Sequence, residues 1–150
     1  MNVEEIMTKN VISVQRDSTI SEIAQAMVEY KVSGLAVLSA GGYLVGIVTE
    51  GDLLRREMTP RLPEFINILG AVIYYHGVER YNEDFKKILA KTALDIMTED
   101  LITVKEGTDV GEVAKIMLDN NIKQIPVVDG SKLLGIITRT DIVKLLLKEE

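Results

Sequence analysis

Two seven-residue stretches of the chain bring together side chains that could bind a nucleotide. They read GIVTEGD at residues 46–52 and GIITRTD at residues 135–141, so each has a Thr three places before an Asp. If the Thr begins a helix, its hydroxyl and the free backbone N–H groups could hold a phosphate, and the Asp could accept hydrogen bonds from a ribose. The same spacing is also a capping box, in which Thr and Asp complete the first helical turn. The motif alone leaves a nucleotide site and a helix cap as alternatives.

The two stretches belong to a longer internal repeat. A shift of 90 residues places residues 3–38 on residues 93–128, with 9 identities in 36 pairs. A shift of 89 residues places residues 44–54 on residues 133–143, with 5 identities in 11 pairs. Many of the other pairs match one apolar residue with another. The chain therefore contains two copies of one supersecondary unit.

Each copy predicts the order strand, helix, strand, strand, helix. Thr19 with Glu22, and Asp109 with Glu112, have the spacing of a capping box at the start of the first helix. Apolar residues then recur on one helical face, and the β-branched runs that follow are typical of strands buried on both sides. We expect an α/β (α+β) fold in which each copy is a small three-stranded sheet with two helices. The expected strands are 11–14, 34–38 and 43–49 in the first copy, and 101–104, 125–128 and 133–138 in the second.

A segment of different character separates the two copies. Residues 64–77 are apolar without a clean period, and residues 82–91 predict a short helix capped by Asn82. Because the segment is too apolar for a solvated linker, we expect it to pack against the repeats or against a partner subunit. The predicted domains are a first repeat at 1–56, an inserted linker segment with a short helix at 57–92 and a second repeat at 93–150.

Composition and charge argue against several kinds of site and partner. The chain has no Cys and one His, His76, so it has no disulfide or Cys-based zinc site, and a metal site has little support. The net charge of −6 disfavours binding to nucleic acid and to anionic membranes. We find no secretory signal and no apolar run of about 18 residues, so we expect no membrane insertion and a cytoplasmic location. No nucleophile and base can be paired, so we expect no enzymatic activity.

The order of these elements, the two IMT stretches, the PVVD strand and the GIITRTDIV ending together resemble the cystathionine β-synthase (CBS) domain family. The resemblance covers residues 3–55 and 93–147. It implies that the two copies pack by their sheets into one pseudo-two-fold module with two related clefts. It also implies that a cleft binds AMP, ADP, ATP or S-adenosylmethionine as a regulatory ligand rather than a cofactor. Modules of this family usually form homodimers, alone or as regulatory parts of enzymes and transporters.

The resemblance also assigns the residues of one cleft, by similarity to the nucleotide-binding gamma subunit of AMP-activated protein kinase. Adenine would lie against the first copy, and the end of the second copy would contact ribose and phosphate. Gln124 replaces one residue of a basic pair. The replacement weakens the binding of a multiply charged phosphate, and Arg139 could compensate for the lost charge. The expected ligand-binding residues are Asn10, Ile12, Val32, Ser33, Gly34, Lys123, Gln124, Thr138, Arg139, Thr140 and Asp141.

The second cleft mirrors the first and is expected to bind less well. Glu50 and Gly51 stand there in place of Arg139 and Thr140, which adds a carboxylate and removes a hydroxyl. We therefore predict that the cleft ending in Asp141 is the better nucleotide site. The expected residues of the second cleft are Asp100, Ile102, Ile122, Lys123, Thr49, Gly51 and Asp52.

Two functions from different classes remain open on these observations. The preferred one is a regulatory module that senses an adenosine-containing ligand, forms a homodimer and acts on an enzyme or a transporter. The alternative is a structural dimerisation module of the same type, with no physiological nucleotide ligand, in which Thr and Asp only cap helices.

Overall fold

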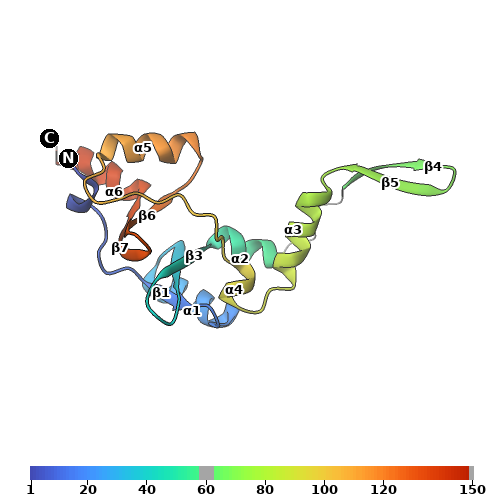
Figure 1. The fold of residues 1–150 in the computed structure, drawn as a ribbon, viewed down its shortest axis with the longest axis horizontal. Helices are drawn as coiled ribbons and strands as arrows, with labels where there is room; N and C mark the ends of the chain where they lie inside the picture. The colour runs from blue at the N-terminus through green and yellow to red at the C-terminus, as the bar shows by residue number, and fades with distance from the viewer. Residues whose placement is uncertain (58–62, 149–150) are drawn as a thin grey trace.

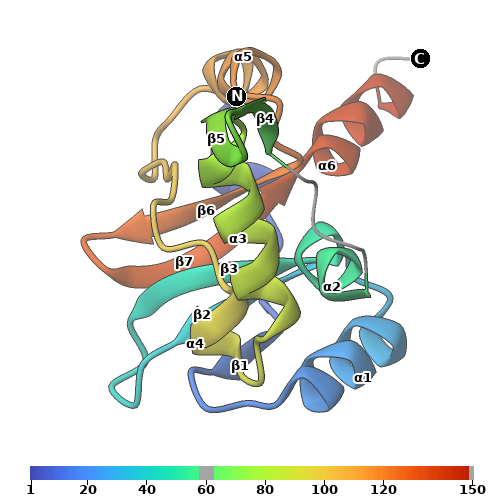
Figure 2. The same cartoon turned by 90° about the vertical axis from the view of Figure 1, so that its right-hand side faces the viewer.

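A computed structural model, which describes residues 1–57 and 63–148, shows two small α/β units and an arm that extends from one of them (Figure 1). The sheets of the two units lie side by side, with β3 next to β7 (Figure 2). The strands are β1 (Ser13–Gln15), β2 (Gly34–Leu38), β3 (Leu44–Thr49), β4 (Glu64–Ile68), β5 (Ala71–His76), β6 (Gln124–Asp129) and β7 (Lys132–Thr138). The helices are α1 (Ile20–Tyr30), α2 (Glu50–Glu57), α3 (Val78–Ile88), α4 (Ala93–Ile96), α5 (Val110–Asp119) and α6 (Arg139–Val143), with 3-10 helices η1 (Val3–Glu5) and η2 (Lys144–Leu147).

The first unit has the predicted three-stranded sheet, whereas the second does not. In the first unit β1 pairs in parallel with β2, and β2 pairs antiparallel with β3. In the second unit β6 pairs with β7, and the strand predicted at 101–104 is reduced to one bridge between Val104 and β6. The cause is Pro126. Its equivalent Ala36 donates a backbone hydrogen bond to Ile12 at 3.4 Å, but Pro126 has no N–H to extend the ladder.

The predicted helix starts are confirmed at α1 and differ at α5. Thr19 and Glu22 form the full capping box: Glu22 N donates to Thr19 Oγ1 at 3.2 Å, and Thr19 N donates to Glu22 Oε2 at 3.1 Å. Asp109 caps α5 through the N–H two residues later, at 2.9 Å, but within this described helix Glu112 does not complete the box. The N-terminus pairs with the chain beside this cap, where Val110 N donates to Met1 O at 3.0 Å and Val3 N donates to Thr108 O at 2.9 Å.

The two units exchange the segments that precede their sheets. η1, at the N-terminus, packs into the core of the second unit, where Val3 is fully buried. α4, which precedes the second unit, packs into the core of the first, where Ala93 and Ile96 are fully buried. Thr8 and Thr98 then form β-bridges to the strand of the other unit. The repeat pattern assigns each segment to its own copy, so this exchange is a finding of the structure.

The exchange explains the Gly that opens each seven-residue stretch. Met7 lies against Gly135, and Met97 lies against Gly46. A Cβ on either Gly would come within 2.6 Å of the facing Met Sδ, a distance that side chains do not tolerate. The two Gly residues therefore let the exchanged segments approach the strands closely, which is one of the standard uses of Gly in a strand.

Two acidic residues help to hold the exchanged segments. Glu4 accepts a hydrogen bond from Gly107 N at 2.8 Å, and this bond lowers the pKa of the Glu4 carboxyl below its ordinary value. Asp95 accepts hydrogen bonds from Lys91 N and Thr92 N, both at 3.1 Å, and these lower the pKa of Asp95. Each carboxylate thus stabilises the fold in its charged form. That contribution is present above the ordinary pKa and is lost as the pH falls through the lowered one.

The insert consists of two parts with different surroundings. α3 begins at Val78, before the cap predicted at Asn82, because the chain turns at Gly77, whose φ is 81°. Beyond α3, Ala90 is buried in the core of the first unit, so this part packs as expected. β4 and β5 instead form an antiparallel hairpin that extends away from both units (Figure 1). We call this hairpin, residues 64–76, the arm.

Candidate functional site

Two clefts of about 430 Å³ each lie between the two units. Ser33, Lys123 and Gln124 line both clefts. Ser33 and Lys123 occupy equivalent positions of the repeat, and their carbonyls accept matching hydrogen bonds from Glu50 N at 2.9 Å and Arg139 N at 3.1 Å. The two clefts are therefore related in the same way as the two copies of the repeat.

The first cleft, which we call the Asp141 cleft, brings together all eleven residues that the sequence assigned to it. They come from the loop after η1, the turn between α1 and β2, the start of β6 and the junction of β7 with α6. Sequence reasoning missed five further residues of the lining. These are Thr8, Val11, Lys31, Ile136 and Lys144.

Thr138 and Asp141 form the cap predicted at the start of α6. Thr138 N donates to Asp141 Oδ2 at 2.9 Å, and Asp141 N donates to Thr138 Oγ1 at 3.2 Å. Only Oδ2 takes part in this cap, and among the described residues no basic side chain forms an ion pair with Asp141. The helix cap and the ribose contact are therefore compatible, since Oδ2 can hold the helix while Oδ1 accepts a hydrogen bond from a ligand.

Arg139 is held against the wall of the Asp141 cleft by main-chain carbonyls. Its Nε donates to Ile122 O at 3.0 Å and its terminal nitrogen donates to Met117 O at 3.4 Å. These bonds fix the guanidinium at the C-terminal end of α5. Arg139 contributes positive charge to the cleft, but we expect lysine side chains, rather than Arg139, to supply cations that can adjust to a phosphate.

Gln124 connects the two units inside the clefts. Its side-chain amide lies over Gly34, and a Cβ on Gly34 would overlap that amide. Gly34, predicted as a ligand contact, is therefore also required by the contact between the first and second units. A larger residue there would displace Gln124 from the cleft wall.

The second cleft, which we call the Asp100 cleft, has all of its predicted residues except Asp52 in its lining. Asp52 is only 3% exposed. Its Oδ2 accepts hydrogen bonds from Thr49 N at 2.9 Å and Thr49 Oγ1 at 3.2 Å, and its Oδ1 lies 3.7 Å from Arg55 Nη1. The structure thus places Asp52 outside the lining, with both of its oxygens facing protein groups. The lining residues that were predicted are Asp100, Ile102, Ile122, Lys123, Thr49 and Gly51.

The two clefts differ in charge. Four basic side chains and one acidic side chain line the Asp141 cleft, whereas two of each line the Asp100 cleft. Positive charge at close range attracts a phosphate even though the whole chain carries −6, because nearby charges are the least screened. The charged residues are Lys31, Lys123, Arg139, Lys144 and Asp141 in the first cleft, and Arg55, Lys123, Glu50 and Asp100 in the second.

The two lysines that sequence reasoning missed carry a signal that could have found them. Lys31 directly precedes the predicted contact Val32, and it ends α1 in the left-handed conformation with φ 54°. Lys144 lies four residues after Thr140, which is one helical turn, so it faces the same side as the predicted phosphate contacts. In the other copy of the repeat Lys31 corresponds to the uncharged Asn121, whereas Lys144 corresponds to Arg55.

Other candidate features lie apart from the clefts. His76 is exposed at the base of the arm and lines neither cleft. Within residues 1–57 and 63–148, no group of three or more His, Asp or Glu side chains could hold a metal ion. No helix in the same ranges is long and apolar enough to cross a membrane.

Comparison with known proteins agrees with this architecture. The family model described as CBS domain matches residues 3–59 and 93–148. The uncharacterised protein MJ1426 of Methanocaldococcus jannaschii is 32% identical over 155 residues, which cover 98% of this chain and 92% of that protein. Other relatives are longer, and this chain spans 23% and 31% of the length of two of them.

Solved structures show the same fold with adenosine compounds bound. The structure of CBSX2 in complex with AMP has a TM-score of 0.76 and 26% identity, covering 99% of this chain and 97% of that one. The CBS domain pair of protein MJ0100, in complex with 5′-methylthioadenosine and S-adenosyl-L-methionine, has a TM-score of 0.74 and 26% identity, covering 100% and 98%. The two repeats, their pairing across two clefts and these matches together show that the chain belongs to the CBS domain family.

Proposed function

We propose that this chain is a regulatory module that binds an adenosine-containing ligand, namely AMP, ADP, ATP or S-adenosylmethionine, in the Asp141 cleft. The observation that carries the proposal is that eleven residues chosen from the sequence line one cleft that has a surplus of basic side chains. The adenosine compounds bound to CBSX2 and to MJ0100 support the ligand class.

The lining of the Asp141 cleft suggests how such a ligand would be held. The adenine ring would lie against the apolar side chains of Ile12 and Val32, and the ribose hydroxyls would donate to Asp141 Oδ1. Phosphate would be held by the hydroxyl of Thr140 and by the ammonium group of Lys144. α6 has only five residues, so few aligned peptide dipoles act on the phosphate, and the lysines supply most of the attraction.

We propose that the module regulates a partner protein rather than catalysing a reaction itself. A ligand that binds between two units can change their relative stability, and a partner that contacts both units would respond to it. The family resemblance gives an enzyme or a transporter as that partner. The absence of Cys fits a reducing compartment such as the cytoplasm, and we propose that location.

The alternative function is a structural dimerisation module without a nucleotide ligand. The observation that favours it is that Thr138 and Asp141 do form a helix cap, as Thr49 and Asp52 do in the other unit. A cap gives both motifs a use without any ligand. Ligand binding to the purified chain decides between the two functions.

A thermal-shift panel tests the proposal. At a hundred times its dissociation constant, a ligand that binds the folded chain stabilises it by about 2.7 kcal/mol, which raises Tm by roughly 5–10 °C for a chain of this size. We expect such a shift with at least one of AMP, ADP, ATP and S-adenosylmethionine, and no shift with inorganic phosphate at equal concentration. If none of the four raises Tm at millimolar concentration, the structural alternative holds.

Removal of the arm should leave ligand binding almost unchanged. No residue from 63 to 77 lines either cleft, and Glu64 and His76 are paired at the base of the hairpin, so the ends can be joined. We expect replacement of residues 65–75 by a short Gly-Ser linker to keep affinity for the best ligand of the panel within severalfold, measured by calorimetric titration. Replacing the whole of 57–92 would be a poorer test, because Ala90 belongs to the first core. Complete loss of binding in a folded arm-less variant would contradict this separation of functions.

A further inference from the structure

One cationic side chain lines both clefts. Lys123 and Ser33, which are equivalent in the repeat, each contribute to the lining of the Asp141 cleft and of the Asp100 cleft. The other charged residues of the two linings belong to one cleft each. The boundary between the clefts therefore contains two equivalent positions, with an ammonium group at one and an uncharged hydroxyl at the other.

The main chain at Lys123 is held in place, whereas its ammonium group is not. Lys123 O accepts a hydrogen bond from Arg139 N at 3.1 Å, where α6 begins. The residue is exposed, and within residues 1–57 and 63–148 its ammonium group forms no ion pair. Because a lysine carries its charge on a flexible four-carbon stem, the ammonium can turn towards a phosphate in either cleft. A single ammonium, however, neutralises the phosphate of one ligand at a time.

Without Lys123 the two clefts have opposite charge. The Asp141 cleft keeps three basic side chains against one acidic, whereas the Asp100 cleft keeps one basic against two acidic. Among the described residues, the cation that remains in the Asp100 cleft is Arg55, whose Nη1 lies 3.7 Å from Asp52 Oδ1, so its charge is already partly neutralised. The Asp100 cleft thus depends on Lys123 to attract a phosphate, and the Asp141 cleft does not.

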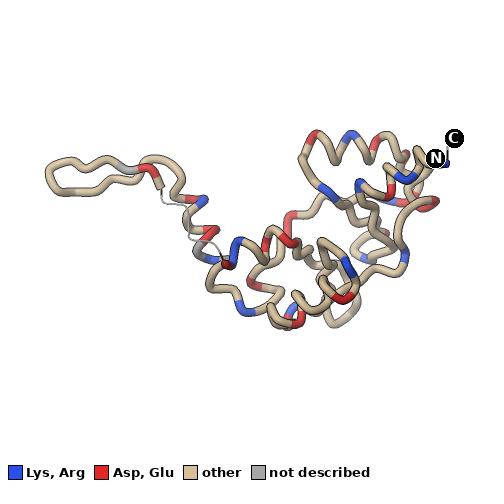
Figure 3. The backbone as a smooth tube through the Cα atoms, turned by 180° about the vertical axis from the view of Figure 1, so that it is seen from behind, with Lys and Arg blue, Asp and Glu red and all other residues tan. Residues whose placement is uncertain are grey.

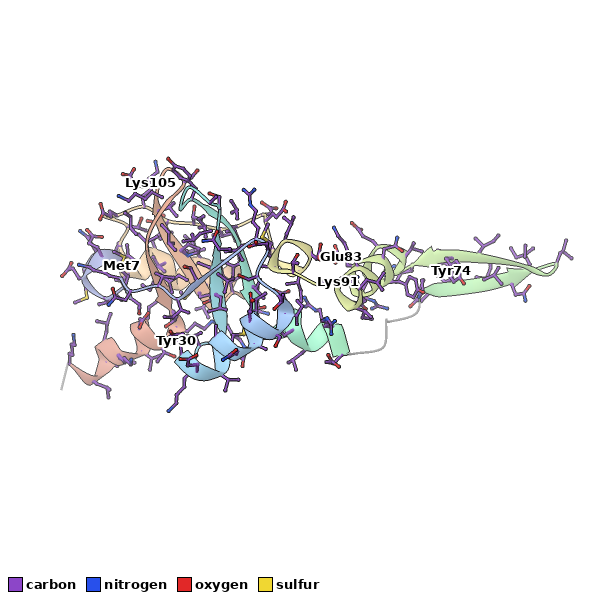
Figure 4. The ribbon with its side chains drawn as sticks, turned by 90° about the horizontal axis from the view of Figure 1, so that it is seen from below. Met7, Tyr30, Tyr74, Glu83, Lys91 and Lys105 are labelled. Atoms are coloured by element: carbon purple, nitrogen blue, oxygen red, sulfur yellow. The ribbon has the colours of Figure 1, made fainter. Side chains whose placement is uncertain are left out.

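The rest of the described chain does not supply the missing charge. Basic and acidic residues are interspersed along both units, so charges of the two signs offset each other at a distance (Figure 3). The arm carries Tyr74 well away from both units (Figure 4), and no residue from 63 to 77 lines either cleft. Exposed charges more than about 10 Å away are largely screened at 0.1 M salt. The side chains within each cleft therefore decide which ligand it attracts.

We infer that Lys123 is a specificity-determining residue shared by the two clefts, so that the chain binds the phosphate of only one nucleotide tightly at a time. The inference rests on the proposed function, because it takes an adenosine compound as the ligand. A nucleotide in the Asp141 cleft draws Lys123 towards its phosphate and leaves the Asp100 cleft with a surplus of negative charge. The Asp100 cleft then disfavours a second nucleotide and accepts an adenosine compound without a phosphate, such as adenosine itself.

The expected size of the effect follows from linkage between the clefts. If a nucleotide in one cleft lowers the affinity of the other, the effect is reciprocal, and the same factor applies in both directions. Couplings between two sites of one protein are typically about five- to 150-fold. Because Lys123 is exposed and therefore partly screened by salt, we expect a factor at the lower end of this range, about fivefold.

Amide NMR of the isotope-labelled full chain follows the two clefts separately. Gly51 lines only the Asp100 cleft and Thr140 lines only the Asp141 cleft, so their amide signals report on one cleft each. In separate titrations with AMP, ADP and ATP, a nucleotide that binds should shift Thr140 of the wild type first and Gly51 at higher concentration. Asp141→Ala weakens the Asp141 cleft and leaves Lys123 available. The nucleotide affinity measured at Gly51 should then rise by about three- to fivefold over the wild type.

Two double variants show whether Lys123 carries the effect. In Asp141→Ala/Lys123→Met the gain at Gly51 should disappear, because the shared cation is gone. In Asp141→Ala/Lys31→Met the gain should remain, because Lys31 lines only the Asp141 cleft. Adenosine has no phosphate and should show no gain at Gly51 in any variant. Each titration is made below the Tm of the variant, so that the loss of the cap at Asp141 does not enter the comparison.

Three results would overturn the inference while leaving the proposed function intact. An affinity at Gly51 that does not rise in Asp141→Ala contradicts it, as does a gain that persists without Lys123 or is lost without Lys31. Shifts with S-adenosylmethionine or adenosine alone also contradict it, because no phosphate is then bound. If none of these compounds shifts either amide, the proposed function itself fails, and the inference fails with it.

Discussion

Replacing Asp141 with Ala should weaken binding of the best adenosine ligand by about ten- to a hundredfold. Asp141 lines the cleft and uses only Oδ2 in the cap, and hydrogen bonds to a charged group contribute roughly 1.5–3 kcal/mol, which corresponds to this loss of affinity. Calorimetric titration of the wild type and of Asp141→Ala measures the difference directly. The same substitution removes the cap acceptor of Thr138 N, so we expect about 1 kcal/mol of lost stability as well.

Asp52→Ala is the matched control for this experiment. Asp52 caps α2 through the same bonds that Asp141 makes at α6, but it is buried and lies outside the lining of the Asp100 cleft. The two variants therefore share the loss of a cap and differ in access to a ligand. We expect Asp52→Ala to change affinity less than Asp141→Ala, with both titrated at a temperature where each is fully folded.

If Asp52→Ala abolishes binding and Asp141→Ala leaves it intact, the assignment of the better cleft is reversed. If neither alters the affinity of a ligand that binds, both Asp residues are helix caps alone.

Replacing Ile96 with Ala should lower the free energy of unfolding by about 2–5 kcal/mol, the range for truncation of a large buried aliphatic residue. Ile96 lies on α4, just before the second unit, yet it is fully buried in the core of the first unit. Its loss would leave a cavity between Ile23, Leu35 and their neighbours in that core. Urea denaturation followed by circular dichroism gives the change in the midpoint and in the free energy.

Leu94→Ala is the control for the truncation of Ile96. Leu94 lies on the same short helix but is 51% exposed, so its truncation should change stability by no more than about 0.5 kcal/mol. The comparison separates burial in the first unit from helix propensity, which the two substitutions alter in similar ways. Equal, small effects of the two substitutions would show that α4 does not belong to the first core in solution.

The exchange of segments changes how the chain responds to truncation. η1 fills the second core through Val3, and α4 fills the first core through Ala93 and Ile96. A chain cut after the first copy would keep η1 without the core that receives it and would lose α4 from its own core. The two units therefore depend on each other for stability, and this dependence is a physical route by which a ligand between them can affect both.

The sequence by itself determined the features that local pattern encodes. The repeat, the order of strands and helices, and the cap at Thr138 follow from apolar periodicity and from side chains that bond to backbone groups three residues away. The eleven residues of the Asp141 cleft could be assigned from the sequence only through the family resemblance, which indicates where the ends of these elements meet. The shortened strand near Val104 could also have been predicted from the sequence, because Pro126 has no N–H to donate to a neighbouring strand.

Tertiary structure alone decided which core receives each apolar segment. Val3 and Ile96 are apolar in the same way as residues that pack in the core of their own unit. Because apolar contact is non-directional, the local sequence pattern cannot indicate which of the two cores receives them. Burial likewise separated Asp52 from Asp141, although both stand at the same place in the motif: Asp52 is buried with Arg55 beside its carboxylate, whereas Asp141 lines a cleft. The apolar composition of the arm predicted a segment that packs against the repeats or a partner. The structure leaves the arm exposed, because no third strand or helix covers either face of the two-stranded hairpin.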